Sequence, residues 1–161
     1  MKILFLDIDG VLNHPGSWHL KDPDNIDIDK LVLLDKIVDE TDCWIVIHSS
    51  WRFSKSTKEI QDLFILRGFE HSHRIFDSTA MIDDRPGSIR VWLRECDDIV
   101  DSFVILDDLG LRSFEGFGKH LVSTSGSIGL TERDCEQVIR LFERQDNTYC
   151  SSGCKTNHEE Q

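Results

Sequence analysis

Short apolar runs alternate with segments of helical periodicity along most of this chain, and no other feature limits its possible folds as strongly. The apolar runs predict strands at residues 2–6, 44–47, 103–106 and 119–122, with a shorter strand near 74–76. Buried strands that alternate with helices are typical of a parallel sheet covered by helices. We therefore expect an α/β fold built on a small, doubly wound parallel sheet.

The segments between the strands carry the signals of four helices. An apolar stripe recurs with helical spacing in each of them, and capping residues stand near the expected ends. These residues are Asp27 and Asp29 for the first helix, Ser56, Glu59 and Gly68 for the second, Pro86 for the third and Thr131 for the fourth. The pair Ser56 and Glu59 has the spacing of a capping box, and Gly68 suits a left-handed C-terminal cap.

The chain has the length of one domain, because 161 residues can bury one sizeable core. We expect residues 1–144 to form this single domain. From Gln145 the sequence turns polar, so residues 145–161 are expected to form a flexible tail. Cys150, Cys154 and His158 lie four residues apart in this tail, but a structural zinc site normally has four ligands.

Cysteine content and hydropathy indicate where the protein resides. The five cysteines are an odd number without the dense spacing of a disulfide framework, which favours reduced thiols. Cys43, Cys96 and Cys135 lie in apolar stretches and are expected in the core. No apolar run approaches the roughly 20 residues that span a bilayer. We expect a cytoplasmic protein without membrane contact, and no obligate protein partner is evident.

The net charge of −12 at pH 7 limits what the protein can bind. Proteins that contact many nucleic-acid phosphates normally carry a basic surface. An extended basic groove is therefore excluded, and any nucleic-acid substrate would be held locally, near its end.

Carboxylates follow two of the predicted strands. Asp7 and Asp9 come after the first strand, and Asp107 and Asp108 follow the strand at 103–106. Ligands bind beyond the carboxyl ends of strands in an open parallel sheet, so these acids converge there if their strands are neighbours. Like charges at close range need a proton or a cation among them, and oxygen ligands without a nearby histidine or thiol favour Mg²⁺. Aspartate also forms turns, but turn formation explains two such pairs poorly.

The run from Phe5 to Leu12, an apolar strand followed by Asp-x-Asp-Gly, resembles the first motif of the haloacid dehalogenase (HAD) superfamily. Later positions resemble the remaining motifs in the expected order, over about the first 110 residues. They are Ser49 (or the adjacent Ser50) for the residue that binds the phosphoryl group, Arg85 (with Arg74 and Arg90 as competitors) for the basic motif, and Asp107 with Asp108 for the acidic metal motif.

This resemblance implies a phosphohydrolase that forms an aspartyl-phosphate on Asp7. Asp9 would protonate the leaving oxygen and later accept a proton from water, for which a partly dry environment is expected. Mg²⁺ would be held by Asp7, the backbone carbonyl of Asp9, and Asp107 or Asp108. Members that cleave carbon–halogen bonds lack the second acid and the metal site, so Asp9 points to phosphate. Phosphoglucomutase-like members keep the second acid but usually carry a cap domain.

The spacing of the motifs leaves no room for the cap domain that closes over small substrates in this superfamily. An open site in related enzymes goes with bulky substrates such as protein or nucleic-acid ends. Residues 47–52, the helix after Arg85 and residues 127–131 resemble the capless HAD domain of Swiss Army Knife RNA repair proteins. That resemblance implies removal of a phosphate from a polynucleotide end or a nucleotide.

Several residues near the expected site are candidates for substrate contacts. Trp51 could stack on a base, although it could equally be a core residue, and Arg52 could meet a phosphate. The loop that follows the nucleophile, residues 13–21, contributes Asn13, His14, Trp18 and His19. A histidine in this loop could contact the substrate.

Two other functions stay open. The first is a phosphatase for small metabolites or phosphoproteins, which the acidic charge permits. The second is a non-catalytic, phosphate-binding scaffold descended from such enzymes. The intact set Asp7, Asp9, Ser49, Arg85 and Asp107 argues against the scaffold.

Overall fold

The computed structural model describes the backbone of residues 1–17 and 24–152. Within these residues one parallel sheet has the strand order β3-β2-β1-β4-β5. The strands are β1 (Lys2–Leu6), β2 (Trp44–Ile47), β3 (Ile75–Ser78), β4 (Ser102–Asp107) and β5 (Leu121–Ser123). The α-helices are α1 (Ile28–Thr41), α2 (Thr57–Leu66), α3 (Arg85–Glu95) and α4 (Glu132–Ser152), joined by short 3₁₀ turns η1 (Ser50–Phe53), η2 (Ser72–Arg74) and η3 (Leu111–Ser113). The predicted α/β fold is confirmed.

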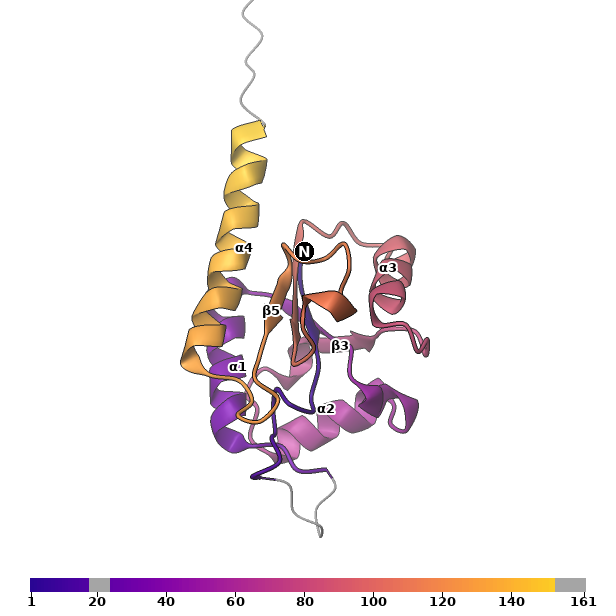
Figure 1. The fold of residues 1–161 in the computed structure, drawn as a ribbon, viewed down its shortest axis with the longest axis vertical. Coiled ribbons are helices and arrows are strands. Elements are labelled where there is room, and N and C mark those ends of the chain that lie inside the picture. The colour runs from indigo at the N-terminus through magenta and orange to yellow at the C-terminus, as the bar shows by residue number, and fades with distance from the viewer. Residues whose placement is uncertain (18–23, 153–161) are drawn as a thin grey trace, which may run out of the picture.

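Helices cover both faces of the sheet, because successive strand residues point to opposite sides. Leu4 and Leu6 of β1 pack in a core formed with α1, α2 and α4. Ile3 and Phe5 pack in a second core, formed with α3 and the segment around η3. Figure 1 shows α1 and α4 on one side of the sheet and α3 on the other. The central strand β1 is therefore buried on both faces and ends at the carboxyl edge of the sheet.

The local helix signals are confirmed in detail. Ser56 and Glu59 form the expected capping box at the start of α2, and Gly68 follows that helix with a positive φ of 89°. Asp134 and Thr131 make the same reciprocal contacts at the start of α4.

Two element boundaries differ from the sequence prediction. Strand β5 begins at Leu121 because the preceding residues form a turn, in which His120 donates its amide hydrogen to the Phe117 carbonyl oxygen. Helix α4 continues beyond Gln145 to Ser152, where a flexible tail was expected. The Gln145 side chain anchors this turn of the helix by bonding the backbone N–H and C=O of Phe103. Residues 153–161, and the side chains of Cys150, Cys154 and His158, lie outside what the structure describes.

The connections between the motifs are short. In the described residues, α1 links β1 to β2, and η1, α2, η2 and β3 lie between β2 and α3. No cap domain interrupts this part of the chain, as expected. No helix among the described residues is long and apolar enough to cross a membrane.

The expected core cysteines lie largely where predicted. Cys43 and Cys135 are buried free thiols, and Cys96 is half-buried. Burial raises the pKa of Cys43 and of Cys135 to about 11, so both stay protonated and unreactive at neutral pH.

Candidate active site

Asp7 and Asp107 lie at the same level of the sheet, just beyond β1 and at the end of β4. Leu6 pairs with Leu106 across these strands, and the Asp7 amide donates to the Leu106 carbonyl oxygen at 2.9 Å. Both carboxylates are almost completely buried. With Asp108 they bring three carboxylate oxygens within 4.8 Å of one another. The structure therefore brings these three acids together, as the strand positions suggested.

Arg85 carries a positive charge into this cluster from the first turn of α3. Its Nη1 donates to Asp7 Oδ2 at 2.8 Å and also to Asp107 Oδ2. The helix can begin here because Pro86 lies in its first turn, where the missing proline N–H has no intrahelical partner to lose. Of the three candidate arginines, Arg85 contacts the acids, whereas Arg74 binds Asp42 and Arg90 binds the Glu115 carbonyl oxygen.

The electrostatics of the acidic cluster suit a divalent cation. Burial raises the pKa of Asp107 to about 7, with a further contribution from the Asp7 charge and an opposing one from Arg85. Burial also raises the pKa of Asp108. A cation among these groups would favour their ionised forms. Because the donors are carboxylate oxygens, the set Asp7, Asp107 and Asp108 fits Mg²⁺ better than a softer metal.

Asp9 lies beside this cluster, but its carboxylate is held by other residues. Asn13 Nδ2 donates to Asp9 Oδ1 at 2.9 Å, and the indole Nε1 of Trp51 donates to Asp9 Oδ2 at 3.0 Å. Asn13 is itself fixed, because it donates to the Asn25 carbonyl oxygen and accepts the Gly10 amide hydrogen. Asp9 is half-buried. Its carboxyl group is thus oriented by two neutral N–H donors from different loops.

The turn after Asp9 must carry a glycine. Gly10 has a positive φ of 77°, and a Cβ at this position would lie 2.5 Å from Asp108 Oδ2. Thr124, which follows β5, donates its hydroxyl to the Gly10 carbonyl oxygen at 2.8 Å. A Cβ at Gly126 would likewise approach Asp108 Oδ2, to 2.6 Å. The Asp108 carboxylate therefore lies between two glycines that no side chain could replace without moving it.

The two serines after β2 occupy different environments. Ser49 is fully buried and caps η1, where its Oγ accepts the Trp51 amide hydrogen at 3.4 Å. Ser50 is exposed. Leu6 of β1 pairs with Ile47 of β2, so His48 is level with Asp7 and Ser49 lies one residue further along. Ser49 is therefore the better candidate for a phosphate ligand.

Two of the residues suggested for substrate contact are buried and contact other parts of the protein instead. Trp51 is 9% exposed and belongs to the core, and Lys55 lies over its ring. Arg52 is 4% exposed, and its guanidinium donates to the carbonyl oxygens of His48, Ser49, Ala80 and Ile82. Stacking of a base on Trp51 and direct phosphate binding by Arg52 are therefore not supported.

The loop after the nucleophile is only partly described. His14 accepts the Gly16 amide hydrogen at Nδ1, and its Nε2 lies 3.7 Å from a carboxylate oxygen of Asp27. These contacts face the start of α1 and not the acidic cluster. Trp18 and His19 lie outside the described residues.

His48 was not singled out from the sequence, yet it lies directly before Ser49 in the interior. Its ring packs against Phe5 and Phe114, and its Nδ1 is 3.2 Å from the Thr79 hydroxyl. Burial lowers the pKa of His48 to about 3, and the charges of Arg52 and Arg85 act in the same direction. His48 is thus neutral at ordinary pH. His48 follows the buried Val46 by two residues, so both side chains point to the same face of the sheet. This spacing could have identified His48 as buried.

Comparison with known proteins identifies one family. The model of the HAD domain in Swiss Army Knife RNA repair proteins matches residues 3–135, which include the strand ends, Arg85 and the acidic cluster. Neither the curated proteins nor the solved structures contain a significant match.

Proposed function

The chain belongs to the family of HAD domains found in Swiss Army Knife RNA repair proteins, and from this premise we propose that it is a Mg²⁺-dependent phosphohydrolase acting on nucleic-acid ends or nucleotides. Membership of the HAD family implies phosphohydrolase activity and, in general, use of Mg²⁺. The observation that carries the proposal is the buried group of Asp7, Asp107 and Asp108, bridged by Arg85.

In the proposed reaction, a carboxylate oxygen of Asp7 attacks the phosphorus atom and the bond to the ester oxygen breaks. Asp9 gives its proton to the departing oxygen, so that an alcohol leaves and an aspartyl-phosphate remains on Asp7. A water molecule then attacks this phosphorus atom, its proton passes to Asp9, and the bond between phosphorus and the Asp7 oxygen breaks. Inorganic phosphate leaves, and both aspartates recover their starting states.

The other polar groups would stabilise the phosphoryl oxygens during transfer. Accepting the Trp51 amide hydrogen leaves the Ser49 hydroxyl hydrogen available to a phosphoryl oxygen. Arg85 supplies a positive charge beside the Asp7 carboxylate. Mg²⁺, held by Asp7, Asp107 or Asp108 and the backbone carbonyl of Asp9, would supply further charge neutralisation.

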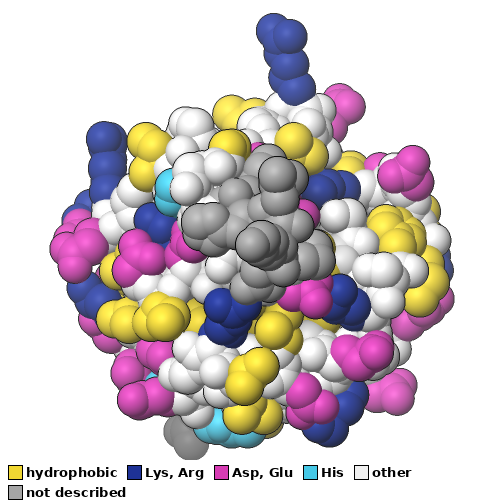
Figure 2. Space-filling model, turned by 90° about the horizontal axis from the view of Figure 1, so that it is seen from below, with side chains coloured by type: hydrophobic (Ala, Val, Ile, Leu, Met, Phe, Trp, Pro, Cys, Tyr) yellow, Lys and Arg dark blue, Asp and Glu magenta, His cyan; other side chains and the backbone are white. Residues whose placement is uncertain are grey.

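Three observations support a phosphate at the end of a large substrate. No cap domain interrupts the described residues, so no inserted domain limits the size of the substrate there. Figure 2 views the end of the molecule at which the strands finish, and its coloured part mixes acidic, basic and apolar side chains without a continuous basic groove. The family model is that of a domain from RNA repair proteins. A substrate held at its terminal phosphate and the adjoining nucleotide fits all three.

The test of the reaction compares the parent protein with Asp7→Asn on a generic phosphate ester, with Mg²⁺ and with a chelator. We expect the substitution and the chelator each to lower phosphate release by at least about 1,000-fold. Asp62→Asn, an exposed aspartate on α2 paired with Lys58, is the matched control and should retain full activity. Equal hydrolysis by Asp7→Asn and the parent would disprove the role of Asp7.

The test of the substrate is a panel of 5′- and 3′-phosphorylated DNA and RNA ends, nucleotides, sugar phosphates and a phosphopeptide. We expect the highest kcat/KM on a nucleic-acid end or a nucleotide. Comparable values on all of these substrates would contradict this specificity while leaving the hydrolase assignment intact.

A further inference from the structure

Phe53 is an aromatic side chain that the proposed reaction does not use. It is the last residue of η1, and 49% of its surface is exposed although the other aromatic of this turn, Trp51, is buried. The guanidinium carbon of Arg52 lies 4.5 Å from the centre of the Phe53 ring. One face of the ring is thus covered by a cation, and about half of the side chain remains open to a ligand.

The support beneath this ring is rigid. Arg52 is buried, and its four hydrogen bonds to backbone carbonyl oxygens join η1 to the loop that follows β3. A guanidinium fixed by a planar set of bonds cannot swing away from the ring at little cost. A stacking surface that is already ordered loses little conformational entropy when a ligand binds.

The ring lies close to the proposed phosphate site. The Arg52 guanidinium donates to the Ser49 carbonyl oxygen at 2.7 Å, so it lies next to the candidate phosphate ligand. Ser49, the candidate phosphate ligand, is the N-cap of η1, and Phe53 is the last residue of this 3₁₀ turn, which rises about 6 Å from Ser50 to Phe53. This separation is similar to that between the phosphate and the base of one nucleotide.

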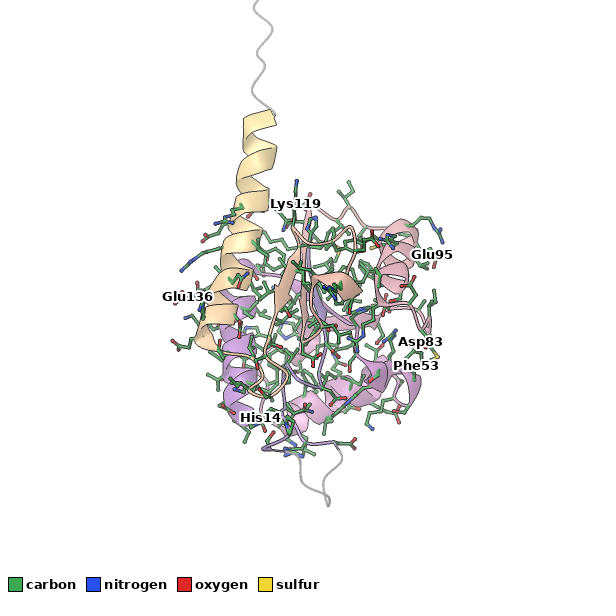
Figure 3. All side chains as sticks on the ribbon, in the orientation of Figure 1. His14, Phe53, Asp83, Glu95, Lys119 and Glu136 are labelled. Atoms are coloured by element: carbon green, nitrogen blue, oxygen red, sulfur yellow. The ribbon has the colours of Figure 1, made fainter. Side chains whose placement is uncertain are left out.

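The loop that Arg52 bonds to carries further exposed apolar side chains. Met81 and Ile82 are exposed on the loop whose carbonyl oxygens bind Arg52. Figure 3 labels Phe53 beside Asp83, the next residue of that loop, and the Asp83 charge acts on Arg52. An uncharged, flat ligand suits such a surface on a protein with a net charge of −12, because stacking needs no basic groove.

We propose that Phe53, supported by Arg52, is the stacking surface for the nucleobase that adjoins the scissile phosphate. This inference rests on the proposed function and deepens it, because it makes the base, and not only the phosphate, a determinant of substrate choice. It also replaces Trp51 as the aromatic residue available to a base.

The experiment measures kcat/KM for two matched substrate pairs: 5′-AMP against ribose 5-phosphate, and 3′-AMP against ribose 3-phosphate. In each pair an anomeric hydroxyl of the sugar phosphate replaces the base of the nucleotide. We expect the parent to prefer at least one nucleotide over its base-free partner, and Phe53→Ala to lower that preference by roughly tenfold, mainly through KM. Phe53→Tyr keeps the ring and should restore the preference. Leu66→Ala, which shortens a side chain that is 80% exposed on α2, should behave as the parent does.

The possible outcomes separate this inference from the proposed function. Hydrolysis of all four esters with the same preference in the parent, Phe53→Ala and Phe53→Tyr would overturn the role of Phe53 alone. Phosphate release from none of the four esters by the parent would overturn the proposed function and this inference with it. A preference that falls in Phe53→Ala and returns in Phe53→Tyr supports the stacking surface.

Discussion

Burial next to a second acid gives Asp107 an unusual protonation equilibrium. Its pKa is raised to about 7 in the folded protein, compared with 3.8 for an ordinary aspartate. Between these two values the folded chain holds a proton that the unfolded chain releases. The contribution of Asp107 to the stability of the metal-free protein is therefore lost progressively as pH rises from about 4 to about 7.

This loss of stability with rising pH leads to a prediction for the metal-free protein. Without Mg²⁺, raising the pH from about 5 to about 8 should lower the melting temperature of the parent relative to that of Asp107→Asn. The expected relative decrease is roughly 2–4 °C or more. Asparagine keeps the shape but does not titrate. Saturating Mg²⁺ should raise the melting temperature of the parent at the higher pH, because it stabilises the ionised carboxylate. Thermal unfolding scans that show a pH-independent difference between the two proteins would refute this account.

Trp51 illustrates how a core residue can position a reacting group. Its indole N–H holds one oxygen of Asp9, and Trp92 makes a comparable bond to Asp77 at 2.6 Å. Trp51→Phe removes the donor but keeps an aromatic ring in the core. If Asp9 is the proton donor, this variant should lose about tenfold in kcat on an alkyl phosphate, whose leaving oxygen needs a proton.

The same variant should lose less than about twofold on p-nitrophenyl phosphate, whose leaving group departs without a proton. Trp92→Phe is the matched control and should alter neither rate beyond its effect on stability. Steady-state kinetics on both esters measure this. An equal loss on both would mean that Trp51 acts only through packing.

At the scale of elements, Arg52 connects η1 to the loop between β3 and α3. This loop leads directly into Arg85, so the bond network from Arg52 helps to place the basic residue of the site. A lysine cannot reproduce the planar set of donors that reaches four carbonyl oxygens. The hydrogen bonds from Arg52, rather than the sequence of the loop, fix the position of the loop that leads into Arg85.

Arg52→Lys should therefore lower the free energy of unfolding by about 1–3 kcal/mol, because buried carbonyl oxygens lose their donors. It should also lower kcat for phosphate release, since the loop that precedes Arg85 loosens. Chemical denaturation and kinetics on a generic ester measure the two effects. Arg94→Lys, at a site on α3 whose side chain is 73% exposed, is the control. Equal stability of the two variants would show that the bonds from Arg52 contribute little.

For the molecule as a whole, the net charge of −12 limits how a long substrate can bind. Contacts to many phosphates would give a steep dependence on salt and a benefit from each added nucleotide. An acidic protein that holds one terminal phosphate and one base should show neither effect.

We accordingly expect kcat/KM to change by less than about threefold between a phosphorylated dinucleotide and an oligonucleotide of about twelve residues. The apparent affinity should also depend only weakly on salt concentration. Kinetics across a length series at two ionic strengths provide the measurement. A steady increase with length, steeper at low salt, would point to an additional binding surface that the described residues do not suggest.

The sequence alone was enough to predict the strand and helix order, because apolar periodicity and caps such as Ser56 with Glu59 are local signals. It also predicted that Asp7, Asp9, Asp107 and Asp108 converge if their two strands are neighbours, because the carboxyl ends of neighbouring parallel strands share one edge of a sheet. The pairing of β1 with β4 fulfils this condition, and Asp7, Asp107 and Asp108 meet while Asp9 lies beside them. These inferences need only short-range patterns and the general geometry of α/β sheets.

Only the tertiary structure could decide which of several similar side chains reaches the site. Arg85 contacts the acids while Arg74 and Arg90 do not, and Trp51 is buried while Phe53, two residues later, is exposed. Gln145 extends α4 by a contact with β4, more than forty residues earlier in the chain. Such outcomes depend on contacts between residues distant in sequence, and on burial that no local pattern records. The sequence thus determined which chemistry the chain carries, and the packing of its elements determined which residues are free to perform it.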